Sequence, residues 1–419
     1  MHSFKLVAAG AIAFAAVRGI DAQQAQRVSR AEAVATALAR GPRLTIARAD
    51  SFAARAQLII ARQYENPILG VSFTKSYPQQ HYTFDLPLDY PWLRDPRISS
   101  ARAGLGAATY RYVFERASVE FDTDTVYTRA LASSSKARLS QRTAFDADSL
   151  FRIARLRRDA GDASELDVQL ALVNAGQLAN AAAMDSLDAI SGLLAVQAAM
   201  GLNADVPTIV LADSLEALPA GGPAGQGGQG GGVGAGAGVP LLVAAAEGEA
   251  QAAELALRME RRRLFSPMAL SLGFEALDPS VQSGGALPTI GFTVPLSLFH
   301  RNGGLIAAAQ AQRDRTAGLL ALARIESYAS LSRGRRALAL ALERARRSEQ
   351  LLDAANRVAS LSLLAYREGA SALPLVLESQ RTARASRMQY IDDVAAARNA
   401  AGLVRLLEMT APTANRTSP

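Results

Sequence analysis

Side chains that commonly bind metals or act as nucleophiles are scarce in this chain of 419 residues. There is no cysteine, and the three histidines are His2, His81 and His300. Without cysteine, the chain cannot form disulfides, thiolate metal sites or an acylated N-terminal cysteine. No histidine-based triad or metal cluster has obvious supporting residues, and no G-x-x-x-x-G-K-[ST] motif occurs. We therefore expect no catalytic activity, no cofactor and no metal site.

Two further features resemble binding signals but favour simpler interpretations. A G-x-G-x-x-G match at Gly225 to Gly230 lies inside the glycine-rich stretch from Pro219 to Pro240. No strand leads into it and no acidic partner follows it, so a flexible linker is favoured over a dinucleotide site. The net charge is +7, but the arginines are spread along helical patterns without interleaved aromatic residues. This pattern indicates solvated helix faces, and we expect no nucleic-acid binding.

The remaining polar candidates surround two glycines, Gly161 and Gly369, that follow long helical patterns. Glycine adopts the left-handed conformation that ends a helix, so each is predicted to lie in a turn where a long helix reverses. Charged side chains lie on both sides of each turn, and solvated turn charges are the ordinary interpretation of such a pattern. The candidate residues are Arg157, Arg158, Asp159, Gly161, Asp162 and Ser164 at the first turn, and Arg367, Glu368, Gly369 and Ser371 at the second.

The elements that position these turns occur twice. At an offset of 208 residues, Phe84 of "FDLPL" aligns with Phe292 of "FTVPL", and the proline-to-glycine spacing of 74 residues is the same in both halves. Upstream of each copy, an alanine-rich helical pattern begins at a proline, Pro42 or Pro240, and stops at another. The repeated unit is therefore a helix, two short strands and a very long helical region.

Four segments alternate with the period of a β-strand: 68–75, 81–88, 268–276 and 288–299. One face is large and apolar and the other is small or charged, which is typical of a transmembrane barrel strand; a soluble sandwich is the alternative. Lipid does not tolerate open sheet edges, so four strands per chain imply that several chains share one barrel. Pro87 and Pro295 lie near strand ends, where a missing hydrogen-bond donor is tolerated.

The helical regions are predicted to form long antiparallel hairpins. No proline occurs between Pro96 and Pro207 or between Pro295 and Pro374, and apolar residues recur every seven positions in both regions. A helix from about Arg97 to Arg158 would be about 93 Å long. Returning helices are predicted at Ser164 to Leu202 and at Ala372 to Met409.

The first 22 residues have the pattern of a secretory signal peptide, with Lys5 before an apolar run of 12 residues from Leu6 to Val17. That run is too short to span a bilayer, and no later stretch is a continuous apolar 18-mer. The predicted organisation is a signal peptide (1–22), a first repeat (23–218, with its hairpin at 97–202), a linker (219–239), a second repeat (240–410, with its hairpin at 304–409) and a tail (411–419).

In its order of motifs, the sequence resembles the outer membrane efflux protein family, the TolC-like channel-tunnels. The matching segments are "ARGPRLTIARA", the strand ends "LPL" and "VPL", "NGGLIAAAQAQ", and the turns "AGDASELDVQLALV" and "EGASALPLVLESQR". The resemblance covers nearly all of the chain after the signal peptide except the linker. Many relatives carry an acylated N-terminal cysteine, which this sequence lacks.

The resemblance implies a mainly α fold with a small β part, in which a homotrimer forms a 12-stranded transmembrane β-barrel with four strands per chain. It implies an outer-membrane conduit in a tripartite efflux or secretion system, with a periplasmic adaptor, an inner-membrane transporter and outer-membrane lipid as partners. The two turns would form the periplasmic entrance, which opens when the adaptor and the transporter dock. Charged pairs at the turns are then a candidate latch, and solvated turn charges are the alternative. The alternative is a periplasmic coiled-coil structural protein without channel activity. The cargo stays open among drugs, metal ions and polypeptides. The barrel-to-tunnel junction would comprise Pro87, Pro295, Asn302, Gly303 and Gly304.

Overall fold

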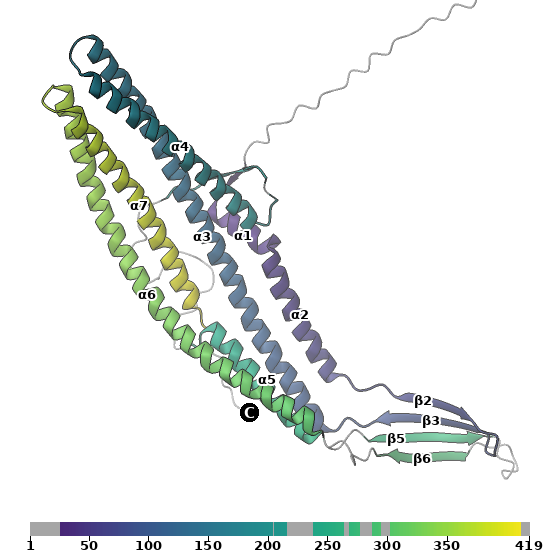
Figure 1. The fold of residues 1–419 in the computed structure, drawn as a ribbon. Helices are drawn as coiled ribbons and strands as arrows, with labels where there is room; N and C mark the ends of the chain where they lie inside the picture. Colours follow the sequence, from purple (N-terminus) through teal and green to yellow (C-terminus); the bar gives the residue numbers. More distant parts are fainter. Residues whose placement is uncertain are drawn as a thin grey trace, which may run out of the picture.

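The computed structural model describes residues 26–203, 205–215, 238–263, 268–276, 287–294 and 302–411. The expected signal peptide, nearly all of the glycine-rich linker, and Pro295 lie outside the described residues. The described chain is a long, curved array of helices with a four-stranded sheet at one end and two helical turns at the other (Figure 1).

Two long helical hairpins form the body of the molecule. The first consists of α3 (Pro91–Asp159) and α4 (Glu165–Ala199), and the second of α6 (Gly303–Arg367) and α7 (Leu373–Leu407). The ends of α4 and α7, and the C-terminal ends of α3 and α6, differ by the offset of 208 residues found in the sequence. The predicted seven-residue pattern lies on packed faces, because no member of either series is exposed. Those members are Ile98, Leu105, Tyr112, Val119, Val126, Leu331, Leu338, Ala345, Leu352, Ala359 and Tyr366.

Helix α3 begins at Pro91, six residues before the predicted start near Arg97. Pro96, the residue before that predicted start, is buried and lies inside the first two turns of the helix. Proline has no backbone N–H, so the carbonyl of Trp92, four residues earlier, loses its helical donor. Nη1 of Arg262 donates to that carbonyl oxygen at 3.3 Å, which supplies a substitute partner.

Three shorter helices pack along the hairpins: α1 (Arg30–Arg40), α2 (Pro42–Arg62) and α5 (Leu241–Arg262). Helices α1 and α2 pack on α3, and α5 packs on both α3 and α6. The helical patterns predicted from Pro42 and Pro240 correspond to α2 and α5, although α2 ends five residues before Pro67. Helix α5, which belongs to the second half, therefore packs on the long helix of each half.

Two very short strands, β1 (Gln26–Val28) and β4 (Ile209–Leu211), pair in parallel beside α1. With α3 and α4 they enclose a core around the fully buried Tyr127. The Tyr127 hydroxyl donates to the carbonyl oxygen of Val28 at 2.9 Å, and burial raises the pKa of this tyrosine to about 12. This core fastens the N-terminal segment to the middle of the first hairpin.

The four predicted strands form one antiparallel sheet in the order β2–β3–β5–β6. They are β2 (Ile68–Phe73), β3 (Gln80–Pro87), β5 (Ala269–Ala276) and β6 (Leu287–Thr293). The observed β2 ends two residues before the predicted boundary, because Thr74 begins the turn, where its N–H donates to Gln79 at 2.9 Å. The predicted end of the fourth strand, after Val294, lies outside the described residues. The central β3–β5 pair joins the two halves of the chain.

The sheet has one apolar face and one polar face, as its sequence alternation predicts. Phe84 lies opposite Leu69 on one side and Leu272 on the other, and Leu272 lies opposite Ile290. Directly paired residues share a face. Ten large apolar side chains of this face are exposed: Leu69, Val71, Phe73, Phe84, Leu86, Leu272, Phe274, Ile290, Phe292 and Val294. The other face includes a hydrogen bond from Ser271 to Asp85 and a contact of 3.4 Å between His81 and Glu275.

Candidate functional site

The two helical turns at the end of the molecule far from the sheet share one backbone geometry (Figure 1). Gly161 has a φ of +87° and Gly369 a φ of +72°. The N–H of Gly161 donates to Arg158 at 2.9 Å and that of Gly369 donates to Tyr366 at 3.1 Å. Such bonds are typical of a helix end that is followed by a left-handed glycine, which confirms the turn predicted at each glycine.

A substitution at the first turn tests this geometry. Gly161→Ala places a Cβ on a left-handed residue and is expected to destabilise the chain by about 1–2 kcal/mol. The matched control is Gly106→Ala, inside α3, where a Cβ has no neighbour within 4 Å. That change is expected to stabilise by about 1 kcal/mol, since alanine favours helix over glycine. The free energy of unfolding in denaturant measures both; equal effects of the two changes would contradict the prediction.

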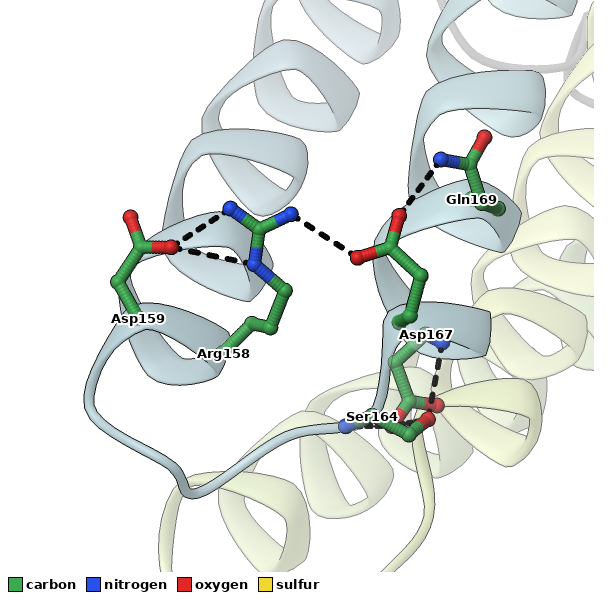
Figure 2. A network of polar contacts seen from close by, with 6 residues as sticks. Arg158, Asp159, Ser164, Asp167 and Gln169 are labelled. Carbon is green, nitrogen blue, oxygen red and sulfur yellow. Dashed lines mark hydrogen bonds and ion pairs between the residues drawn. The ribbon is translucent and has the colours of Figure 1, made fainter.

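Around the first turn, charged side chains form a local network (Figure 2). The Arg158 guanidinium donates to Asp159 at 2.6 and 3.1 Å and to Glu165 at 2.9 Å. The Gln169 amide donates to the other oxygen of Glu165 at 2.8 Å. The pKa of Arg158 is raised most by its hydrogen bond to Asp159 and next by its hydrogen bond to Glu165. The pKa of Glu165 is lowered most by the hydrogen bond from Gln169 and next by the hydrogen bond from Arg158.

The lowered pKa of Glu165 gives the first turn a pH dependence. The ionised form stabilises the turn at pH values above the ordinary glutamate pKa of about 4.3, and this contribution is lost as the pH falls through the lowered value. We therefore expect the amides of residues 160–164 to exchange faster below about pH 4, after correction for intrinsic exchange rates. Glu165→Gln is expected to remove this acid dependence; an unchanged profile in that variant would assign the effect to another group.

Helix α4 begins directly after Ser164, whose side chain forms a reciprocal cap with Asp167 (Figure 2). The Ser164 hydroxyl accepts from the Asp167 N–H at 3.1 Å, and the Asp167 carboxylate accepts from the Ser164 N–H at 3.3 Å. The sequence prediction included Ser164 but missed Asp167 and Glu165. The S-x-x-D spacing is a helix-start signal that identifies Asp167.

At the second turn, the charged side chains are exposed and less connected. The Ser371 hydroxyl donates to the carbonyl of Ala372 at 3.4 Å. Within the described part of the chain, the side chains of Arg367, Glu368 and Asp162 form no hydrogen bond or ion pair. The structure therefore brings Arg158 and Asp159 together but leaves these three predicted site residues apart.

An apolar cluster and one cation–π contact hold the two turns side by side. The Arg157 guanidinium lies 5.0 Å from the ring centre of Tyr366, which belongs to the other hairpin. Tyr366 packs in a cluster drawn from both hairpins: Ala154, Val168, Ala171, Tyr366, Leu373 and Val376. Tyr366 was predicted as a helix-packing residue but not as a contact of Arg157.

At the opposite end, the sheet-to-helix junction of the first half is built around Asp89. Pro87 is the last residue of β3, opposite Ala269. Asp89 follows it, with a side chain only 10% exposed, and accepts from Arg97 at 2.6 Å and contacts Arg94 at 3.4 Å. These ion pairs hold the start of α3 against the end of β3. Sequence patterns predicted Pro87 but not Asp89.

In the second half, Asn302 performs a similar role for α6. It is the residue before the helix and is left-handed, with a φ of 56°. Its amide nitrogen donates to both the backbone oxygen and a carboxylate oxygen of Glu260, each at 2.9 Å. Gly303 and Gly304 form the first turn of α6, with open space where a Cβ would lie. Asn302 therefore anchors α6 to the end of α5.

The described ranges contain no group of three or more histidine, cysteine, aspartate or glutamate residues arranged to hold a metal ion. None of their helices is both long enough and apolar enough to cross a membrane.

Comparison with solved structures identifies the architecture. The outer-membrane channel OprN matches with a TM-score of 0.74 and 15% sequence identity, over 90% of this chain and 89% of that chain. This chain has the TolC-like channel fold. A membrane protein from Pseudomonas aeruginosa matches at 0.72 with 17% identity, over 93% of this chain and 94% of that chain. VceC from Vibrio cholerae matches at 0.70 with 15% identity, over 90% and 96%.

The TolC-like fold was predicted from the order and doubling of the sequence motifs, and the structural matches confirm it. No family model matches the sequence, and no curated protein matches it either. The similarity therefore lies in the three-dimensional arrangement more than in residue identity. OprN and VceC are described as outer-membrane proteins, OprN as a channel.

Proposed function

We propose that this chain is the outer-membrane channel-tunnel component of a tripartite efflux or secretion system. In this proposal it is a passive conduit that carries substrates from an inner-membrane transporter, through the periplasm, to the exterior. The observation that carries the proposal is an exposed apolar sheet face at one end of two helical hairpins, one of which contains a helix of 69 residues. At about 1.5 Å per residue, such a helix is about 100 Å long, far beyond the needs of a compact domain.

The apolar sheet face supports insertion into lipid. Ile290 and Leu69 on this face are 73% and 68% exposed, a state that water would disfavour over a contiguous patch. Among the described residues, the outer strands β2 and β6 of the sheet each have one edge without a paired strand. Because lipid requires every backbone group to be paired, β6 of one copy is expected to pair with β2 of the next. Three copies of four strands would close a barrel of twelve.

The internal repeat independently supports a ring of copies. Helix α5 of the second half packs on its own long helix, α6, and on α3 of the first half. Its counterpart in the first half is α2, which packs on its own long helix, α3. The repeat then requires α2 to pack on α6 of a neighbouring copy. Consistent with this, α2 has four exposed large apolar residues: Ile46, Phe52, Ile59 and Ile60.

The helical turns are proposed as the periplasmic entrance, where an adaptor protein and an inner-membrane transporter dock. Their distance from the sheet supports this assignment, since the sheet would lie in the outer membrane (Figure 1). The entrance would include Arg157, Arg158, Asp159, Gly161, Asp162 and Ser164 with Arg367, Glu368, Gly369 and Ser371. For the latch hypothesis, Asp159→Ala combined with Asp162→Ala is expected to raise single-channel conductance; unchanged conductance would make these charges solvated surface groups.

Planar-bilayer recording tests the conduit directly. Purified trimer is expected to give discrete channel openings, and a folded trimer that never conducts would overturn the proposal. Membrane fractionation tests the alternative of a periplasmic coiled-coil structural protein. Recovery in the outer-membrane fraction is expected, whereas recovery wholly in the soluble periplasm would support the alternative.

A further inference from the structure

A cavity of about 900 Å³ lies on α3, between α2 and α5, in the half of α3 nearer the sheet. Cavities that hold small molecules usually have volumes of about 300–1,000 Å³. Large apolar and aromatic side chains from all three helices line it: Ile46, Tyr112, Phe114 and Leu242. The cavity therefore has the size and the apolar lining of a site for a small organic molecule.

Two small residues of α3, Gly104 and Ala108, leave the cavity open. A Cβ added at Gly104 would have no neighbouring atom within 4 Å. At the positions 208 residues later, α6 has the larger residues Gln312 and Thr316. The first half of the chain thus has open volume where the second half has two longer side chains. A ligand can make contacts with the cavity wall that protein atoms do not already make.

The charge of the cavity favours a cation. Two arginines and three carboxylates line it, which gives it a net charge of −1. Both arginines are already neutralised, because Arg43 pairs with Glu115 at 2.7 Å and Arg111 pairs with Glu249. The third carboxylate, Asp50, is exposed and has no hydrogen bond or ion pair with any described residue. A positive ligand would therefore complement Asp50 without disturbing either ion pair.

We propose that this cavity binds organic cations that have an apolar body. The apolar body would lie against Ile46 and Leu242, and the positive charge would lie near the Asp50 carboxylate. The rings of Tyr112 and Phe114 add to the preference, since aromatic faces attract organic cations. A metal ion, which has no apolar body, would gain nothing from this lining.

The cavity lies on the side of α3 that would face the axis of the proposed ring of copies. The residues of α3 that bond to α2 or α5 are Arg97, Ser100, Arg111 and Glu115. At about 100° per residue, all of them fall within about 60° around α3. Arg102 and Val113, which are exposed, lie on the opposite side. In a closed ring of helices, each helix has its two neighbours on the side toward the axis, so the cavity would open into the tunnel.

This placement makes organic cations a class of substrate for the proposed conduit. In the proposed assembly, α6 of the neighbouring copy packs on α2 and would add a wall beside Ile46, which leaves the inner side of the cavity open. The assignment as substrate rests on the proposed function. Binding itself can be measured on protein that does not conduct, so the two can fail separately.

Equilibrium dialysis of tetraphenylphosphonium against the purified full chain in detergent measures binding. Gly104→Gln combined with Ala108→Thr inserts the residues of the second half into the cavity and is expected to weaken binding about tenfold or more. Gly106→Gln is the matched control, because this residue lies about 200° away from Gly104 around α3. It is expected to bind within about twofold of the unaltered chain. Equal affinities of the filled and unaltered chains, or an equal loss in the control, would overturn the site.

Tetraphenylborate tests the charge, since it has nearly the same shape as tetraphenylphosphonium and the opposite sign. After uptake by protein-free detergent is subtracted, the anion is expected to bind about tenfold or more weakly than the cation. Asp50→Asn is expected to weaken binding of the cation about threefold and to leave that of the anion no weaker. An anion that binds as tightly as the cation would overturn the assignment to cations.

A single cysteine tests the side of the helix, because the chain has no cysteine of its own. Ala108→Cys, treated with a positively charged methanethiosulfonate in planar bilayers, is expected to lower single-channel conductance, and tetraphenylphosphonium is expected to slow the reaction. Val113→Cys, on the opposite side of α3, should show neither effect. Channels that conduct but do not respond at Ala108→Cys would overturn the placement on the inner wall. A chain that binds the cation but never conducts would support the site and count against the proposed function.

Discussion

Ile290→Arg is expected to abolish recovery of the protein in the outer-membrane fraction, whereas Thr289→Arg should leave it there. Both residues are exposed and adjacent in β6, but they lie on opposite faces of the sheet. If the apolar face contacts lipid, an arginine in mid-strand costs about 2–4 kcal/mol per chain. In a barrel of several copies this cost is repeated in every copy, so assembly fails.

Thr289→Arg is the control that makes the prediction for Ile290→Arg specific to the apolar face. A soluble sheet with both faces in water would tolerate either arginine, since neither side chain is buried in the single chain. Density-gradient fractionation of membranes measures the outcome. Equal recovery of the two variants would remove the support for a lipid-facing surface, and loss of both would indicate a general folding defect.

Tyr127→Ala is expected to destabilise the first half of the chain by about 3–5 kcal/mol. Tyr127 is 0% exposed and is the largest side chain in the core between α1, the β1–β4 pair and the first hairpin. Its removal leaves a cavity and also leaves the Val28 carbonyl without its 2.9 Å donor. Denaturant unfolding monitored by circular dichroism measures the loss.

Tyr127→Phe separates the hydrogen bond from the packing and is expected to cost about 1 kcal/mol of stability.

The Tyr127 hydroxyl also makes the stability of the chain depend on pH in the alkaline range. Because burial raises the pKa of Tyr127 to about 12, the unfolded chain releases this proton first, at about pH 10. The contribution of Tyr127 to stability is therefore complete below about pH 10 and is lost as the pH rises to about 12. Tyr127→Phe should lack this component, and identical alkaline profiles would contradict it.

The long elements were predictable because each of them occurs twice in the sequence. The equivalence of Gly161 and Gly369 fixed both turns, and their positive φ values confirm it. The alternation from Phe84 and Phe292 outward predicted the strands and their faces, which the register confirms. The two halves of the chain supply the comparison that sequences of related proteins would otherwise provide.

Short elements and distant polar partners were not predictable in the same way. Strands β1 and β4 have three residues each, too few to show a period. Helix α1 had a readable start, the S-x-x-E spacing of Ser29 and Glu32, which was missed. Arg384 and Asp185 are far apart in a chain with 45 basic and 38 acidic residues, so composition and spacing could not select this pair.

The central β3–β5 pair makes the order of synthesis important. Phe84 and its partner Leu272 are separated by the whole first hairpin, the linker and α5, so the sheet closes a very large loop. Such closure is slow compared with helix formation, and an isolated two-stranded hairpin is marginally stable. While the second half is still being synthesised, β2 and β3 have no stable partner. The apolar sheet face can therefore form only after β5 has been synthesised, when α1 to α5 are already complete and α6 and α7 are still to come.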